Sequence, residues 1–176
     1  MKNLVDHLSQ YAAYHRDPRN IASHFIGIPM IVLAVAILLS RPGWAVAGLT
    51  LSPALLVTLA SAWFYLRLEI GLGLLMTGLL ALSLWAGQTL AAQSTLVWLG
   101  SGIGLFVVGW AIQFVGHYYE GRKPAFVDDV SGLIVGPLFV VAELAFLLGL
   151  RQALKQEIER RAGPVRTPSA GHSGSV

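Results

Sequence analysis

The sequence predicts an all-α integral membrane protein, a bundle of four to five apolar helices preceded by an amphipathic N-terminal helix. Hydrophobic residues make up 55% of the 176 residues and charged residues only 12%, about half of the roughly 25% found in soluble domains. Long stretches have no charged side chain, and basic residues lie mainly at the ends of these stretches, as membrane anchors do. The absence of cysteine excludes disulfides, thiolate catalysis and iron–sulfur clusters. The net charge of +3 does not indicate a nucleic-acid partner.

Residues 1–17 form the predicted amphipathic helix, because apolar and aromatic side chains recur in it at helical spacing. Pro18 is expected to end this helix, since the residue before a proline is pushed out of the helical region. Asn20 is a candidate N-cap for the next helix or, alternatively, a side chain that orients a histidine ligand.

Four charge-poor stretches are long enough to cross a membrane, which takes about 20 residues. They cover residues 21–40, 42–66, 70–90 and 95–117. Pro29 and Pro53 lie inside the first two stretches and predict a kink in each. The polar sequence QTLAAQST places the turn between the last two.

The last third of the chain begins with a polar loop at residues 120–131, which an apolar segment at 132–150 follows. Residues 151–162 are predicted to be a basic amphipathic helix. Residues 163–176 are rich in Gly, Ser and Pro, which predicts a disordered tail. We therefore expect one membrane-embedded domain over residues 1–162.

The basic residues place the N-terminus, the 120–131 loop and the tail in the cytoplasm. A fifth full span would put the tail on the opposite side from the loop. Either segment 132–150 is re-entrant or interfacial, or one earlier stretch does not span; Glu143 favours the first, because an ionisable side chain weakens a span. The expected location is the inner, cytoplasmic membrane of a bacterium or the endoplasmic reticulum of a eukaryote, with the site near the cytoplasmic face.

Three histidines, His15, His24 and His117, stand near the ends of predicted helices at one membrane depth. Interfacial histidines that are satisfied by hydrogen bonds are the simpler interpretation, but the shared depth favours one site. His117 and Glu120 are three residues apart, so they project from one helix face, as the paired ligands of di-iron bundles do. This set suits Fe(II), Mn(II) or Zn(II), and histidines with one carboxylate and open positions are typical of iron that activates O₂. His7 is a further candidate.

Other polar residues are candidates for orienting ligands or binding substrate. Gln113 lies one helical turn before the third histidine. Arg122 and Lys123 would hold an anionic headgroup or a fatty-acid carboxylate, unless they are only positive-inside anchors. Glu143 is a functional candidate or the buried partner of an arginine. Asp128 is a candidate too, or a cap of the helix that follows.

Two segments together resemble a known family. The first contains Tyr14-His15, Asn20, His24 and Gly27-x-Pro29. The second contains Gln113-Phe114-x-Gly116-His117-xx-Glu120-xxx-Pro124-Ala125, then Asp128, then Gly136-Pro137-Leu138-Phe139-xxx-Glu143. They resemble the membrane family of 2-hydroxy-palmitic acid dioxygenases, and the resemblance extends from about Tyr11 to Glu143.

The resemblance implies an Fe(II)-dependent dioxygenase that uses O₂ to remove one carbon from a 2-hydroxy fatty acid, as in fatty-acid α-oxidation. The family's histidines match His15, His24 and His117, and Glu120 matches the acidic position that follows. Asp129 stands where the family often has Asn, and His7 lies outside the motif.

Two other functions stay open from the residues alone. A transporter or assembly factor would use the histidines only to bridge helices and would hold no iron. Another metal-dependent lipid oxidase, such as a hydroxylase or desaturase, would usually carry more histidines in H-x-x-H-H groups, which this sequence lacks. The expected partners are a 2-hydroxy fatty acid, O₂ and membrane lipid.

Overall fold

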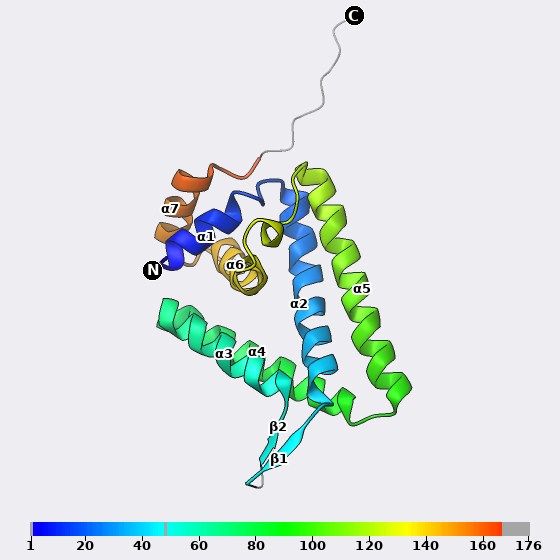
Figure 1. The fold of residues 1–176 in the computed structure, drawn as a ribbon. Coiled ribbons are helices and arrows are strands. Elements are labelled where there is room, and N and C mark those ends of the chain that lie inside the picture. Colours follow the sequence, from blue (N-terminus) through cyan, green and yellow to red (C-terminus); the bar gives the residue numbers. More distant parts are fainter. Residues whose placement is uncertain (1, 48, 167–176) are drawn as a thin grey trace, which may run out of the picture.

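The computed structural model describes residues 2–47 and 49–166, most of which are helical (Figure 1). The elements in chain order are α1 (Leu4–Ala12), α2 (Pro18–Ser40), β1 (Trp44–Val46), β2 (Leu49–Leu51), α3 (Pro53–Leu68), α4 (Ile70–Ala91), α5 (Thr95–Glu120), the 3₁₀ turn η1 (Ala125–Val127), α6 (Gly132–Leu147) and α7 (Gln152–Ala162). The predicted all-α class with apolar helices is confirmed.

The pair α2 and α5 carries most of the candidate site, and the two helices lie side by side over most of their length (Figure 1). Glycine allows this close approach: a Cβ at Gly27 would lie 2.8 Å from the carbonyl oxygen of Gly109. Gly102 and Gly116 of α5 also face side chains of α2. The hydrophobic effect drives helix association only weakly in lipid. Small residues let two helices approach closely, so that van der Waals packing between their backbones stabilises the pair instead.

The stretch 42–66 does not form one kinked span, so that prediction is wrong. It contains a β-hairpin, in which Trp44 pairs with Leu51 in the antiparallel register, and the shorter helix α3. Ser52 caps α3 by accepting a hydrogen bond from the backbone N–H of Leu55 at 3.2 Å. Pro53 occupies the first helical position, where a missing N–H costs nothing, so it begins a helix instead of bending one.

The N-terminal prediction is also corrected at two residues. Helix α1 ends at Ala12, and Pro18 is the first residue of α2 instead of the residue that terminates α1. Asp17, and not Asn20, is the N-cap, because its carboxylate accepts from the backbone N–H of Arg19 at 2.8 Å. A loop over residues 13–17 therefore separates the two helices.

The segment after residue 132 turns back on itself. Helices α6 and α7 are bent by 119° relative to each other, and α7 packs against α1 (Figure 1). Leu8, Phe139 and Ile158 bring these three helices into one buried core. An ion pair of 2.8 Å between Arg161 and Asp6 also joins α7 to α1. A re-entrant or interfacial course for residues 132–150 stays a prediction.

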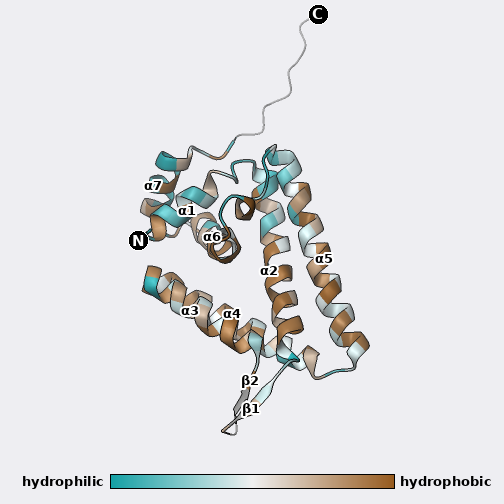
Figure 2. Cartoon of the chain, viewed as in Figure 1, coloured by the Kyte–Doolittle hydropathy of each residue, from teal (hydrophilic) through white to brown (hydrophobic). Residues whose placement is uncertain are grey.

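The helices α2, α4 and α5 are each long and apolar enough to cross a membrane, and the bent pair α6 and α7 would be a fourth span if it counts as one. Figure 2 shows apolar residues along α2, α3, α4 and α5 and hydrophilic residues around α1, α7 and the end where α2 begins and α5 ends. These helices give the chain the character of a membrane protein, with one polar end.

The first residues of the predicted tail pack against the loop at 13–17. The backbone N–H of Arg166 donates to the carbonyl oxygen of Arg16 at 2.8 Å. The Arg166 guanidinium forms an ion pair of 3.1 Å with Glu120. The predicted disorder therefore does not hold for residues 163–166, and residues 167–176 lie outside the described residues.

Candidate metal centre

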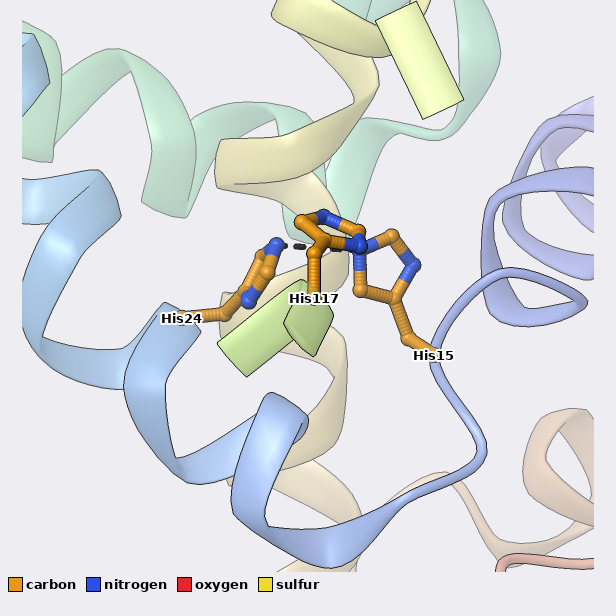
Figure 3. A group of neighbouring side chains, drawn as sticks. All are labelled: His15, His24 and His117. Carbon is orange, nitrogen blue, oxygen red and sulfur yellow. Dashed lines mark hydrogen bonds between the residues drawn. The ribbon is translucent and has the colours of Figure 1, made fainter. Parts of the chain in front are cut away.

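Three histidines from three different elements meet at the polar end of the molecule (Figure 3). His15 comes from the loop at 13–17, His24 from α2 and His117 from α5. Each offers one ring nitrogen, and these nitrogens all lie within 4.8 Å of one another. The three side chains are buried, with exposed fractions of 0%, 1% and 6%. The chain thus brings together residues that are about a hundred positions apart.

The hydrogen bonds of two histidines fix which ring nitrogen carries the proton. Nδ1 of His15 lies 2.7 Å from the carbonyl oxygen of Tyr11, and Nδ1 of His24 lies 2.8 Å from that of Asn20. A carbonyl only accepts, so both Nδ1 atoms are donors and both Nε2 atoms carry lone pairs. The two Nε2 atoms are 2.9 Å apart. Two lone pairs at this distance repel, and a cation between them removes the repulsion.

His117 completes the group. Its ring centroid lies 5.0 Å from that of His15 and 5.1 Å from that of His24. Its Nδ1 is buried, and within the described part of the chain nothing hydrogen-bonds to it. A buried polar atom without a partner is costly and needs an explanation such as an ion. The donor set therefore fits a metal ion.

His15 is held in the form that binds metals. Burial, together with the neighbouring His24 and His117, lowers the pKa of His15 well below its ordinary value. The imidazole is therefore neutral at physiological pH, and only a neutral imidazole has a lone pair for a metal. Its hydrogen bond to a backbone carbonyl is the usual support of a metal-binding histidine.

Glu120 has contacts that differ from those predicted. One carboxylate oxygen accepts hydrogen bonds from the backbone N–H groups of Arg16 at 2.9 Å and Asp17 at 2.8 Å, and from the Asn20 amide at 3.1 Å. The other oxygen pairs with Arg166. Among the described residues, the group of converging donor atoms contains no carboxylate. Glu120 thus fastens the loop that carries His15, and a role as metal ligand stays a prediction.

A cavity of about 60 Å³ opens beside the histidines. His24, His117 and Gln113 line it, and Gln113 is 4% exposed with an Oε1 that has no hydrogen-bond partner in the described residues. A water-sized group needs at least about 10–15 Å³, so the cavity has room for a small polar head. Gln113 is placed to bind such a head, whereas Asn20 contacts Glu120 and Tyr14.

The remaining candidates lie outside the wall of this cavity among the described residues. Arg122 donates to the carbonyl oxygen of Ala13 at 2.9 Å. Lys123 and Tyr14 both bind Asp128. Their contacts tie the loop after α5 to the loop at 13–17.

Glu143 lies on α6 and His7 on α1. The charge of Glu143 acts on the guanidinium of Arg16, which fits the buried acid–arginine alternative. His7 packs edge-on against Phe64, with ring centroids 5.6 Å apart, and is not among the converging nitrogens.

Sequence reasoning missed Tyr11. Its ring stacks on that of His15, with centroids 4.2 Å apart and planes at 7°, and its carbonyl holds the Nδ1 proton of that histidine. It also lines the cavity. The signal was the spacing of four residues between Tyr11 and His15, which puts the two rings on one side of a helical turn.

Glu120→Gln is expected to lower the free energy of unfolding by about 1–3 kcal/mol, because hydrogen bonds to a charged acceptor contribute this much. The metal content of folded protein should stay near that of the wild type. Arg166→Ala is the control: it removes the ion pair with Glu120 and a 3.4 Å hydrogen bond to the Glu120 carbonyl oxygen, but leaves the three hydrogen bonds that fasten the loop. Because the Arg166 side chain is half-exposed, this loss should cost about 1 kcal/mol or less. Thermal unfolding and metal analysis check both; a Glu120→Gln protein that folds normally but loses metal would make Glu120 a ligand.

Comparison with known proteins identifies the family of the chain. The family described as 2-hydroxy-palmitic acid dioxygenase Mpo1-like matches residues 1–148. The chain is 32% identical over 159 residues to the 2-hydroxy-palmitic acid dioxygenase MPO1 of Saccharomyces cerevisiae, covering 89% of this chain and 88% of the yeast protein. No solved structure matches the chain significantly. With a family match that includes all three histidines, the chain belongs to the Mpo1-like family of 2-hydroxy-palmitic acid dioxygenases.

Proposed function

We propose that this protein is an Fe(II)-dependent dioxygenase that oxidises a 2-hydroxy fatty acid with O₂ and shortens it by one carbon. The observation that carries the proposal is the pair of facing Nε2 lone pairs of His15 and His24, 2.9 Å apart and joined by buried His117. The name of the yeast relative supplies the substrate class.

The proposed reaction balances without a further reductant. The bond between C1 and C2 breaks, C1 leaves as CO₂, and C2 becomes the carboxyl carbon of the shorter acid, with one molecule of water formed. All electrons that O₂ takes up come from these two carbons. A bound Fe(II) would supply Lewis acidity and redox chemistry and would orient both reactants.

The protein's own residues hold and shield this chemistry. His15, His24 and His117 would bind the metal, and the carbonyl oxygens of Tyr11 and Asn20 fix the orientation of the first two rings. Burial of all three rings keeps bulk water away.

The substrate's polar head would bind in the small cavity beside these histidines. The Gln113 amide has a free Oε1 in the described part of the chain, which can accept a hydrogen bond from the substrate hydroxyl.

The alternative of histidines that only bridge helices is less consistent with these contacts. A direct hydrogen bond between His15 and His24 needs a proton on one Nε2, yet both Nδ1 atoms already face carbonyl acceptors. We further propose that the site faces the cytoplasm, because the basic residues of its loops, Arg16, Arg19 and Arg122, follow the positive-inside pattern.

Removal of metal tests the proposal. Detergent-purified protein that is stripped with a chelator is expected to lose turnover, and Fe(II), but not Zn(II), should restore it. With 2-hydroxypalmitate labelled with ¹³C at C1, the label should appear in CO₂ and the lipid product should be pentadecanoate. A product that retains the label would indicate a hydroxylase or desaturase, and activity that survives complete removal of metal would contradict the proposal.

A further inference from the structure

A second, larger cavity of about 490 Å³ lies between α2, α3, α4, α5 and α6. Aliphatic side chains form most of its wall. Two of its polar residues already bond elsewhere: the Tyr65 hydroxyl donates to the carbonyl oxygen of Ile134 at 2.7 Å, and the Ser83 hydroxyl donates to that of Leu79 at 2.9 Å. The wall therefore suits a hydrocarbon better than a polar ligand.

This apolar chamber adjoins the histidine cavity. The two share five wall residues, which come from α2, α5 and α6: Ile31, Val32, Trp110, Leu133 and Pro137. A molecule with a polar head at the histidines would thus have its apolar remainder directed past these shared residues into the chamber.

The residues of α2 that line the histidine cavity and the chamber indicate how long the two cavities are together. His24 stands at the histidine cavity, and Val35 and Leu39 line the chamber farther along the same helix. At about 1.5 Å per residue, Leu39 lies about 22 Å from His24 along the helix axis. One lipid chain spans about half of a hydrocarbon core of roughly 30 Å. The space is long enough for one extended acyl chain.

We infer that the chamber is the binding site for the hydrocarbon chain of the substrate, with the 2-hydroxy acid group at the histidines. This inference rests on the proposed function and adds where the chain lies and what limits its length. The occupant is a single acyl chain, because the chamber continues from a cavity with room for one small polar head. Shared wall residues would keep C1 and C2 beside the histidines.

Helix α3 supplies a variant for the far end. Tyr65 contacts α6 near the histidine cavity, whereas Val57 lies two turns earlier in α3, toward the hairpin end. Val57→Phe fills the far part of the chamber. Leu56→Phe is the matched control, because Leu56 is the neighbouring residue and is exposed to a similar extent, 53% against 47% for Val57, but is not part of the chamber wall.

The expected result is a change in chain-length preference. Val57→Phe should lower kcat/KM for 2-hydroxypalmitate at least tenfold and leave 2-hydroxyoctanoate unchanged, since each methylene that loses its buried site costs about fourfold in affinity. Leu56→Phe should leave both substrates unchanged. Equal effects of the two variants, or no effect of Val57→Phe, would overturn the inference.

A cross-linking measurement tests binding without turnover. A 2-hydroxypalmitate analogue with a photoactivatable diazirine at its methyl end is irradiated with iron-loaded protein under anaerobic conditions. Mass spectrometry should find it attached to the chamber residues of α2 and α3, such as Leu39 and Val57. Attachment only to outward-facing residues, or a phospholipid in the chamber that the analogue does not displace, would overturn the inference.

The two proposals fail in different ways. Cross-linking to the chamber residues without turnover would contradict the proposed reaction but would support the chamber as an acyl-chain site. Normal turnover with a chain-length preference that Val57→Phe does not change would support the proposed reaction but would contradict the chamber as an acyl-chain site.

Discussion

His117→Ala is expected to abolish turnover and to lower the affinity for iron by at least 10–100-fold, so that less iron is bound. Changes to residues that only support a metal ligand already cost this much. Nδ1 of His117 is buried without a hydrogen-bond partner within the described residues, so removal of the imidazole relieves this cost and offsets part of the packing that is lost with the ring. Metal-free His117→Ala should therefore melt close to the metal-free wild type.

The difference should appear when iron is added. At an iron concentration of about 100 times the dissociation constant, binding stabilises the folded protein by about 2.7 kcal/mol. The wild type should gain this stability, and His117→Ala should not. Iron per protein, turnover and the iron-dependent rise in Tm measure the three effects on protein extracted from membranes.

Arg122→Ala is the comparison variant. The guanidinium binds the carbonyl oxygen of Ala13 in an exposed position, so its removal should raise KM several-fold at most and leave iron content intact. A His117→Ala protein with full iron and normal turnover would remove the metal site. If both variants lost stability and kept their activity per folded molecule, the histidine would have only a structural role.

The histidine group could be predicted because the type of residue, and not only its spacing, pointed to it. Polar ring residues stand out against an apolar sequence, and the ends of antiparallel spans return to one membrane depth. His24 and His117 were therefore expected at one depth, and the packing of α2 against α5, which the sequence did not predict, brings them together. His15 followed because it is only a few residues before α2.

The partner of Glu120 could not be predicted from spacing. Because Glu120 follows His117 by three residues, both side chains lie on one side of α5. The Glu120 carboxylate nevertheless accepts hydrogen bonds from backbone N–H groups that have no other partner among the described residues. The loop at 13–17 offers the backbone N–H groups of Arg16 and Asp17. Those donors exist only because α2 begins at Pro18, which the sequence pattern had assigned to the end of α1.

The prediction of one kinked span for residues 42–66 was wrong for a related reason. Mean hydropathy is the same for one long helix as for a hairpin followed by a shorter helix. Proline is compatible with a kink inside a helix and with its first position. Ser52 directly before Pro53 is the sequence signal for the second choice, because serine is a preferred N-cap. Helix α3 then packs against α4.

Gly27→Leu is expected to separate α2 from α5 and to remove both stability and metal binding. A Cβ at this position would already lie 2.8 Å from the carbonyl oxygen of Gly109 and 3.1 Å from the side chain of Gln113. The backbone of α5 cannot rotate out of the way as a side chain can, so the helices must move apart. Overpacking costs about 1–3 kcal/mol and occasionally more.

The metal site should suffer as well, since Gly27 lies one turn after His24 and the shift carries that ring away from His117. Gly104→Leu is the matched control on α5, because a Cβ there meets no atom within 4 Å. It should melt and bind iron as the wild type does. If Gly27→Leu kept the wild-type Tm and iron content, the close contact of α2 and α5 would not be what positions the three histidines.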